Sequence, residues 1–386
     1  MSERARILFV SQESPWAHGS GGQHRSRLLF DALQQIGPVD VLLLDEGEKD
    51  AVDTGGRPEI LARLTWSESK LAVDKQARNR FINGWCAANL DWNDYALVVG
   101  RPVRVMSKIA WPRNLRSMVD CDDIVYHLVP KTEGLAARAW AAMRARIRTW
   151  QIGLAIRRCD HAFFASRRDR FLFDARRSSL LPNVVRCGAI PAEPAHAPAR
   201  VLCVGTMWYP PNRHGIESFL DQCWPAIAAQ VPGLVLRIVG AASVEGRGRW
   251  EAVDRVEAPG HVPDLRAEYG RALFTVAPIY YGSGSCIKFL ESGSFGRVCV
   301  TTPFVASAYG DDFRDSESTL VARDAREMVR KCVMIAGDAR TRDEIAQRAR
   351  SIVAERYTIE RFEDTVCDAA KRLLVRDGLR IATTAR

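Results

Sequence analysis

The most constraining feature of the sequence is a pattern that occurs twice: a continuous apolar run, a turn that contains glycine, and a helical repeat of apolar residues. The first copy has its apolar run at 6–11, glycines at 19–22 and the helical repeat at 24–36. The second copy starts at 200–205 and continues into a helical repeat at about 215–230. Apolar runs that do not alternate with polar residues are typical of parallel strands covered on both faces. The sequence therefore predicts an α/β protein with two Rossmann-like units.

The length and one proline-rich segment divide the chain into parts. With 386 residues, 47% of them hydrophobic, the chain is long enough for two cores. The segment AEPAHAPA at 192–199 is typical of a linker. Thr358 is a suitable N-cap for a last helix over 359–375, which we expect to cross back to the N-terminal domain. The predicted parts are an N-terminal domain at 1–182, a linker at 183–199, a C-terminal domain at 200–357 and a C-terminal segment at 358–386.

Composition indicates where the protein works. No run of about 18 apolar residues is present, and the apolar run at 7–10 is too short for a signal peptide. The ten cysteines include no C-x-x-C pair and are typical of reduced thiols, so we expect a cytoplasmic protein. A net charge of +9 fits an anionic substrate or an anionic membrane surface. Nucleic acid is not an expected partner, since no nucleic-acid-binding module is evident.

The stretch IYYGSGSCIKFLESGSFGR at 279–297 carries the strongest chemical signal. A predicted strand at 273–278 leads into a Gly/Ser loop, and a helix starts near Cys286. Lys288 lies in the first turn of that helix, and Glu291 is three residues further on the same face. Such a loop and lysine suit a phosphate, and the carboxylate suits a ribose diol. The alternative is a capped helix with an ordinary surface pair of charges.

This loop and helix belong to a longer pattern that resembles a known family. The spacing Gly284-x-x-x-Lys288-x-x-Glu291, followed by Gly296-Arg297 and by Thr301-Thr302-Pro303, resembles the nucleotide-sugar motif of family 4 glycosyltransferases, which have the GT-B fold. Other segments similar to that family are VGTMWYPPNRHGIESFLDQCWPAI at 204–227, VPDLRAEYGRALFTVAPI at 262–279 and GGQHR at 21–25.

The resemblance implies two Rossmann-like domains facing a central cleft and a retaining glycosyltransferase of the hexosyltransferase type. Such an enzyme moves a sugar from a nucleotide-diphosphate donor to an acceptor hydroxyl, here in bacterial polysaccharide, glycolipid or glycoside biosynthesis. The chain departs from many members at Ser283, where they have a glutamate that contacts the donor sugar. Residues expected at the nucleotide sugar are Gly21, Gly22, Gly205, Gly282, Ser283, Gly284, Ser285, Cys286, Ile287 and Glu291.

The chemistry of glycosyl transfer indicates which charges matter. The reaction develops an oxocarbenium-like centre and a departing diphosphate, so the protein has to stabilise negative charge on the leaving group. Lys288, Arg213 and backbone N–H groups are the candidate donors, with Glu291 beside them. Arg213 follows the first strand of the second domain and is expected to point at the cleft, or else to be a surface arginine. We expect no cofactor beyond the nucleotide-sugar co-substrate, whose base the sequence does not define.

An acidic cluster in the N-terminal half has two interpretations. The sequence Asp120-Cys-Asp-Asp123 after a predicted strand contains D-x-D, which binds a divalent metal in glycosyltransferases of the GT-A class. Because it lies in the other domain from the donor motif, we expect no metal here. Asp122, Asp123 and His127 are instead candidates for acceptor contacts. The alternatives are helix capping for the carboxylates and a packed structural role for the histidine.

The segment 134–158 predicts a long helix that contains arginine but no lysine. Arginine beside Trp140 and Trp150 suits the interface of an anionic membrane, so a peripheral enzyme acting on a lipid-linked acceptor is one prediction. The alternative is a core-packed helix with solvated arginines, in an enzyme whose acceptor is a soluble sugar or another small molecule.

Two other functions use the same donor loop. A sugar-nucleotide epimerase of the GT-B fold would need a carboxylate and a histidine beside the sugar. A catalytically silent nucleotide-sugar-binding partner is the third hypothesis, and the serine at 283 is its only support. Donor hydrolysis, donor isomerisation and binding without turnover would distinguish the three.

Overall fold

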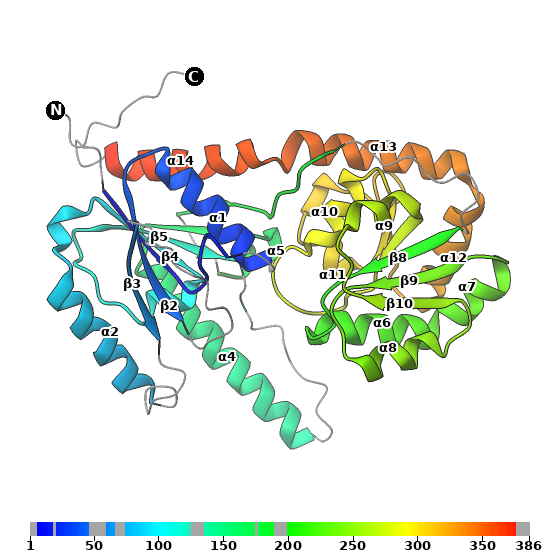
Figure 1. Cartoon of the computed structure of the whole chain (residues 1–386), viewed down its shortest axis with the longest axis horizontal. Coiled ribbons are helices and arrows are strands. Elements are labelled where there is room, and N and C mark those ends of the chain that lie inside the picture. The colour runs from blue at the N-terminus through cyan, green and yellow to red at the C-terminus, as the bar shows by residue number, and fades with distance from the viewer. Residues whose placement is uncertain are drawn as a thin grey trace. The chain divides into compact units, whose positions relative to one another are not determined.

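Figure 1 shows the computed structural model of the chain, which describes residues 6–17, 21–45, 59–65, 74–122, 124, 135–173, 177–188 and 199–375. The chain forms two compact units. The N-terminal unit comprises residues 1–182 with 359–386, and the C-terminal unit comprises residues 183–358. Each unit contains one parallel sheet, which confirms the prediction of two Rossmann-like units.

Among the described residues, the sheet of the N-terminal unit has seven parallel strands in the order β3-β2-β1-β4-β5-β6-β7. The strand order reverses between β1 and β4, and open sheets of this kind bind ligands beyond the carboxyl ends of the strands at such a point. Both strands are buried along their whole length, as their continuous apolar sequences predict. The strands are β1 (Ile7–Ser11), β2 (Val39–Asp45), β3 (Ile60–Thr65), β4 (Leu97–Arg101), β5 (Arg116–Cys121), β6 (His161–Phe164) and β7 (Ser178–Leu180).

The last helix of the chain completes the N-terminal unit. In Figure 1, α14 (Ile359–Val375) lies beside α1 (Gly21–Gln34), with Phe362 and Val366 buried. The Cys367 thiol donates to the carbonyl of Ala32 at 3.4 Å. The prediction that this helix crosses back to the N-terminal unit is therefore confirmed. The other helices of this unit are α2 (Lys75–Asn89), η2 (Trp92–Asp94), α3 (Val103–Met106), α4 (Leu135–Arg157) and α5 (Arg167–Phe173).

The sheet of the C-terminal unit repeats the same topology, with the order β10-β9-β8-β11-β12-β13. Its strand order reverses between β8 and β11, which run side by side in parallel. The shared order explains why the sequence shows the same opening twice. The strands are β8 (Arg200–Val204), β9 (Val235–Val239), β10 (Val256–Gly260), β11 (Ala272–Ala277), β12 (Cys299–Thr301) and β13 (Leu320–Val321).

The predicted helix at 215–230 is two helices in the structure, α6 (Pro210–Gln222) and α7 (Trp224–Gln230). They separate at Cys223 because Pro225 has no N–H to continue the ladder of the first helix. None of the helices in the described ranges is both long and apolar enough to cross a membrane. The remaining helices are α8 (Val244–Glu251), α9 (Leu265–Arg271), α10 (Ile287–Ser294), α11 (Pro303–Ala306), η4 (Gly310–Asp312), α12 (Ala325–Gly337) and α13 (Ala339–Arg356).

Candidate functional site

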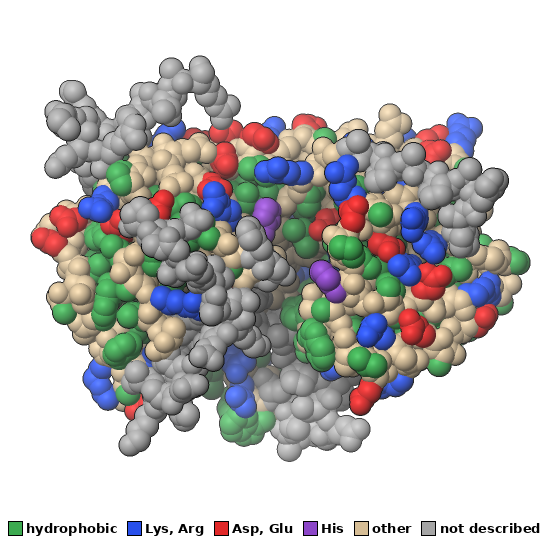
Figure 2. All heavy atoms as spheres, viewed as in Figure 1, with side chains coloured by type: hydrophobic (Ala, Val, Ile, Leu, Met, Phe, Trp, Pro, Cys, Tyr) green, Lys and Arg blue, Asp and Glu red, His purple; other side chains and the backbone are tan. Residues whose placement is uncertain are grey.

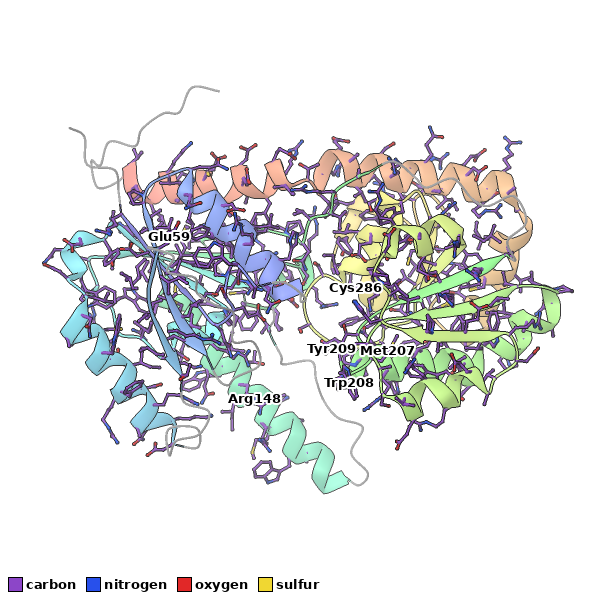
Figure 3. The ribbon with its side chains drawn as sticks, viewed as in Figure 1. Glu59, Arg148, Met207, Trp208, Tyr209 and Cys286 are labelled. Carbon is purple, nitrogen blue, oxygen red and sulfur yellow. The ribbon has the colours of Figure 1, made fainter. Side chains whose placement is uncertain are left out.

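The candidate site lies where the strand order of the C-terminal sheet reverses. The chain leaves β8 through residues 205–209 into α6, and leaves β11 through residues 278–286 into α10. Figure 3 shows Trp208, Tyr209 and Cys286 together at one end of the C-terminal unit. The motif found in the sequence therefore lies at the position where sheets of this topology bind ligands.

The loop before α10 has an unusual backbone. Gly282, Gly284 and Cys286 have φ angles of 138°, 72° and 52°. A side chain at Gly282 would also place its Cβ 3.0 Å from the hydroxyl oxygen of Tyr209. Only glycine suits the first position, and a non-glycine residue such as Cys286 is held in its conformation at a cost of about 1–3 kcal/mol. Backbone strain of this size is concentrated at ligand-binding and catalytic sites.

Side chains from other segments form hydrogen bonds to the carbonyl groups of the loop and to the Ser285 hydroxyl. The buried Tyr309 hydroxyl donates to the carbonyl of Ser285 and lies 3.1 Å from the carbonyl oxygen of Cys286. Asn183 donates to the Ser285 hydroxyl at 3.0 Å. Because a trans peptide points its C=O and N–H in opposite directions, the N–H of Ile287 faces away from Tyr309. That N–H belongs to the first turn of α10, where the helix dipole favours an anion.

Lys288 is the cation of the site. Its Nζ lies 2.7 Å from Oδ1 of Asn212, and the amide nitrogen of Asn212 donates to the carbonyl of Thr206 at 2.8 Å. Lys288 is half-buried, and it forms no ion pair with any residue that the structure describes. The ammonium charge at the start of α10 is therefore not compensated by a carboxylate.

Glu291 lies one turn further along α10 and has a neutral partner. Its Oε2 accepts a hydrogen bond of 3.0 Å from Tyr269, whose buried ring stacks on Phe295. Burial raises the pKa of Glu291, while the hydrogen bond from Tyr269 and the charge of Lys288 oppose that rise. The alternative of an ordinary surface pair is wrong, because Glu291 bonds to Tyr269 and forms no ion pair with Lys288.

Glycine at the end of β8 leaves room for the cation. A Cβ on Gly205 would lie 2.6 Å from Nζ of Lys288. Gly240, at the end of β9 with a φ of 137°, approaches so closely that its Cβ would lie 2.0 Å from the carbonyl oxygen of Gly205. Larger residues at these two positions would displace Lys288 or separate the two strand ends.

Arg213 differs from its predicted setting. It lies in the first turn of α6 and not in a loop, because the helix begins at Pro210, which suits a first helical position. Its side chain is exposed and has no ion pair or hydrogen bond to the rest of the described chain. The structure thus brings together residues 282–288, Gly205 and Glu291, but joins Arg213 to none of them by a contact.

The N-terminal unit holds the other predicted glycines. Gly21 and Gly22 are the first residues of α1, and a Cβ on Gly22 would lie 2.1 Å from Oε2 of Glu13. The same oxygen of Glu13 accepts a hydrogen bond of 2.8 Å from Arg101. This glycine therefore lets the Glu13 carboxylate lie against the start of α1.

The acidic cluster after β5 is paired with arginines. Arg25 and Asp120, both buried, form a bidentate pair with two distances of 2.8 Å. Arg101 lies 3.2 Å from the Asp120 carboxylate and 3.3 Å from that of Asp122. Within the described ranges, no cluster of histidine, cysteine, aspartate or glutamate could hold a metal ion. Asp123 and His127, the other acceptor candidates, lie outside the described residues.

Five residues of the site were not predicted from the sequence: Asn183, Asn212, Tyr209, Tyr269 and Tyr309. Asn212 lies in PPN, and its position next to Arg213, a predicted contact of the diphosphate, was the available signal. The three tyrosines are far from the loop in sequence, and nothing in their local pattern distinguishes them from core residues.

Comparison with known proteins finds one matching family model and several similar folds. Residues 198–351 match the family model described as "Glycosyl transferases group 1", and no curated protein matches the sequence. Sucrose-phosphate synthase of Thermosynechococcus elongatus has a TM-score of 0.70 at 17% identity, covering 97% of this chain and 100% of that one. HepE of Anabaena, solved with UDP, has a TM-score of 0.65 at 12% identity, covering 95% of this chain and 100% of its own. TarM has a TM-score of 0.58 at 13% identity over 74% of this chain, which spans only 57% of the TarM chain.

The fold is the predicted GT-B architecture, and its second half carries the domain that matches the glycosyltransferase model. Within this chain, the similarity to the group 1 glycosyltransferases covers residues 198–351. The matched domain and the shared fold agree with the resemblance to the family 4 enzymes.

Proposed function

We propose that the chain transfers a sugar from a nucleotide-diphosphate donor to an acceptor hydroxyl with retention of anomeric configuration. The observation that carries this proposal is Lys288, a half-buried and uncompensated cation beside a strained glycine loop at a helix N-terminus. HepE was solved with UDP and with UDP-glucose, and its fold matches 95% of this chain, which supports a donor of the same chemical class.

In the proposed mechanism, the donor diphosphate lies against residues 282–287. Lys288 and the first N–H groups of α10 stabilise the negative charge that grows on the leaving diphosphate as the glycosidic bond breaks. Gly205 leaves the space that the ammonium needs, and Glu291 accepts hydrogen bonds from the ribose hydroxyls. Arg213, being exposed and without a bond to the described chain, is a second candidate to contact the diphosphate once donor binds.

A panel of UDP-, GDP- and TDP-sugars tests the proposed function. The purified chain is incubated with each donor without acceptor, and the nucleotide products are separated. Slow release of nucleoside diphosphate from one donor is the expected result, since water replaces the missing acceptor. An isomerised donor would indicate an epimerase, and binding without turnover would indicate a silent binding protein.

We expect catalysis to be independent of divalent metal. Lys288 and the start of α10 supply positive charge for the diphosphate, while Asp120 and Asp122 are paired with Arg25 and Arg101. Donor hydrolysis measured with excess EDTA should therefore match the rate with magnesium or manganese. Activity that disappears in EDTA and returns with manganese would assign a metal role to the acidic cluster.

We propose that the acceptor is a lipid-linked sugar in bacterial polysaccharide or glycolipid biosynthesis and that the N-terminal unit binds an anionic membrane. Trp140, Met143, Ile147, Trp150 and Leu154 are exposed at spacings of three and four residues and form one stripe on α4, here called the α4 stripe. The face of α4 that packs on the unit, around Ile152 and Ile156, points elsewhere. Figure 2 shows basic and hydrophobic side chains close together at the lower edge of the view, where α4 lies in Figure 1.

Charge on both sides of the α4 stripe supports the same proposal. Arg144 lies over the ring of Trp140, with its guanidinium carbon 5.4 Å from the ring centroid. Arg146 and Arg148 are also exposed, Figure 3 shows Arg148 on this helix, and α4 contains no acidic residue. Each arginine near an anionic surface contributes about 1 kcal/mol, and tryptophan suits the interfacial region.

Vesicle flotation tests this location. The chain should float with vesicles containing phosphatidylglycerol at low salt, and should float less at high salt or with neutral lipid. A Trp140→Ala/Trp150→Ala double variant should lose most of the bound fraction, whereas Arg340→Ala on α13 should not. Absence of flotation at low salt would refute the membrane proposal and favour a soluble acceptor, without affecting the donor site.

A further inference from the structure

We infer that Asn212 is a positioning residue for the donor reaction. Its side chain holds the Lys288 ammonium in place without neutralising the positive charge. The inference rests on the proposed function, because it assigns the role of Lys288 in donor binding. It goes beyond the sequence motif, in which position 212 has no assigned part.

Asn212 is itself held firmly in the structure. It is the third residue of α6, after two prolines whose fixed φ angles suit the first turn of a helix. Gly215 of the same helix lies against the loop that follows β11, since a Cβ there would lie 2.1 Å from the carbonyl oxygen of Pro278. The start of α6 therefore has little freedom to move relative to the loops of the site.

The nitrogen and the oxygen of the Asn212 side-chain amide each form a hydrogen bond, and together these bonds define the orientation of the amide. Its Nδ2 donates to the carbonyl of Thr206 at 2.8 Å, so its Oδ1 is left to accept from Nζ of Lys288 at 2.7 Å. Because the acceptor of Nδ2 is a carbonyl and the donor to Oδ1 is an ammonium, the flipped amide would lose both bonds. Asn212 thereby links the loop after β8 to the first turn of α10 through the Lys288 side chain.

For phosphate binding, the important property of Asn212 is that its side chain carries no charge. A carboxylate at the same distance would form an ion pair and cancel the field that an incoming phosphate would experience. Glu291, the nearest carboxylate along α10, bonds instead to Tyr269. Both charged residues on this face of α10 thus have uncharged partners, which keeps their charges available to a ligand.

The test compares Asn212→Ala and Asn212→Asp with the wild-type chain by calorimetric titration of UDP, GDP and TDP and of the matching nucleosides. For the diphosphate that the wild type binds, Asn212→Ala should weaken binding about three- to tenfold, through loss of one hydrogen bond. Asn212→Asp should weaken it about tenfold to a hundredfold, because the aspartate competes with the diphosphate for the ammonium. Binding of the nucleoside should change less than threefold in both variants.

Gln230 provides the matched control. It is an exposed amide that donates to the carbonyl of Ala226 at 3.1 Å, and Gln230→Ala and Gln230→Glu should leave both affinities unchanged. Diphosphate affinities equal to wild type in both Asn212 variants would overturn the inference and leave the proposed function standing. Equal losses for nucleoside and diphosphate would also overturn it, and a wild-type chain that binds no nucleoside diphosphate would overturn both.

Discussion

Replacing Lys288 by alanine is expected to lower kcat/KM for the donor by about tenfold to a hundredfold. A charge-assisted contact to a phosphate is worth roughly 1.5–3 kcal/mol, and the Lys288 ammonium, bonded to the neutral Asn212, can supply such a contact. Glu291→Ala should cause a loss of similar size by removing the acceptor for the ribose hydroxyls. Steady-state kinetics of donor hydrolysis, with the nucleotide sugar that the donor panel selects, measures both variants.

The control for this experiment is a variant that removes a charged side chain of the same unit outside the site. Arg340 and Glu344 form an exposed i,i+4 pair at 3.0 Å on α13, so Arg340→Ala should leave the kinetics unchanged. Circular dichroism checks that every variant is folded. Wild-type kinetics in both Lys288→Ala and Glu291→Ala would remove the donor-site assignment.

The second large effect is expected in the N-terminal unit, where Asp120→Ala should destabilise the fold by about 3–5 kcal/mol. Asp120 is fully buried, accepts hydrogen bonds from Arg25 and lies 3.2 Å from Arg101, and both arginines are also buried. Burial opposes the charge of Arg25, but the carboxylates of Asp120 and Asp122 outweigh that effect and raise its pKa. Removing Asp120 would leave two buried guanidinium groups without their central partner.

Urea unfolding of the full chain, followed by fluorescence and circular dichroism, measures this change. Arg27 and Asp31 of α1 form an ion pair at the same distance of 2.8 Å, but with side chains 46% and 34% exposed. Asp31→Ala should therefore cost less than about 1 kcal/mol. Equal unfolding midpoints for the two variants would mean that the buried network contributes no more to the free energy of unfolding than a surface ion pair does.

Much of the fold could be predicted from the sequence because its central strands are buried on both faces. The runs that became β1, β8 and β11 are mostly apolar and do not alternate with polar residues, which is typical of parallel strands covered on both faces. The edge strands β3 and β13 were not predicted. β3 is largely half-buried or exposed and β13 has two residues, so neither has a distinct apolar pattern.

The candidate site was predictable only where it is continuous in sequence. Residues 282–291 are neighbours along the chain, so their spacing alone placed a lysine and a glutamate on one helix face. The partners of that face are distant: Asn212 is 76 residues from Lys288, and Tyr269 is 22 residues from Glu291. Similarly, Arg25 is 95 residues from Asp120, so the sequence offered no sign that arginines neutralise the acidic cluster.

The return of α14 to the N-terminal unit affects the order in which the protein can be made. During synthesis, residues 1–182 leave the ribosome long before residues 359–375, with the whole C-terminal unit between them. At ordinary translation rates of about 5–20 residues per second, roughly 10–35 s pass between residue 182 and residue 359, and the surface of α1 that α14 covers waits at least that long for its partner. Phe362, Val366 and Leu374 then bury that surface. The first unit to be synthesised is therefore the last to be completed, and a nascent chain arrested before residue 359 would leave an apolar face open to chaperones or to aggregation.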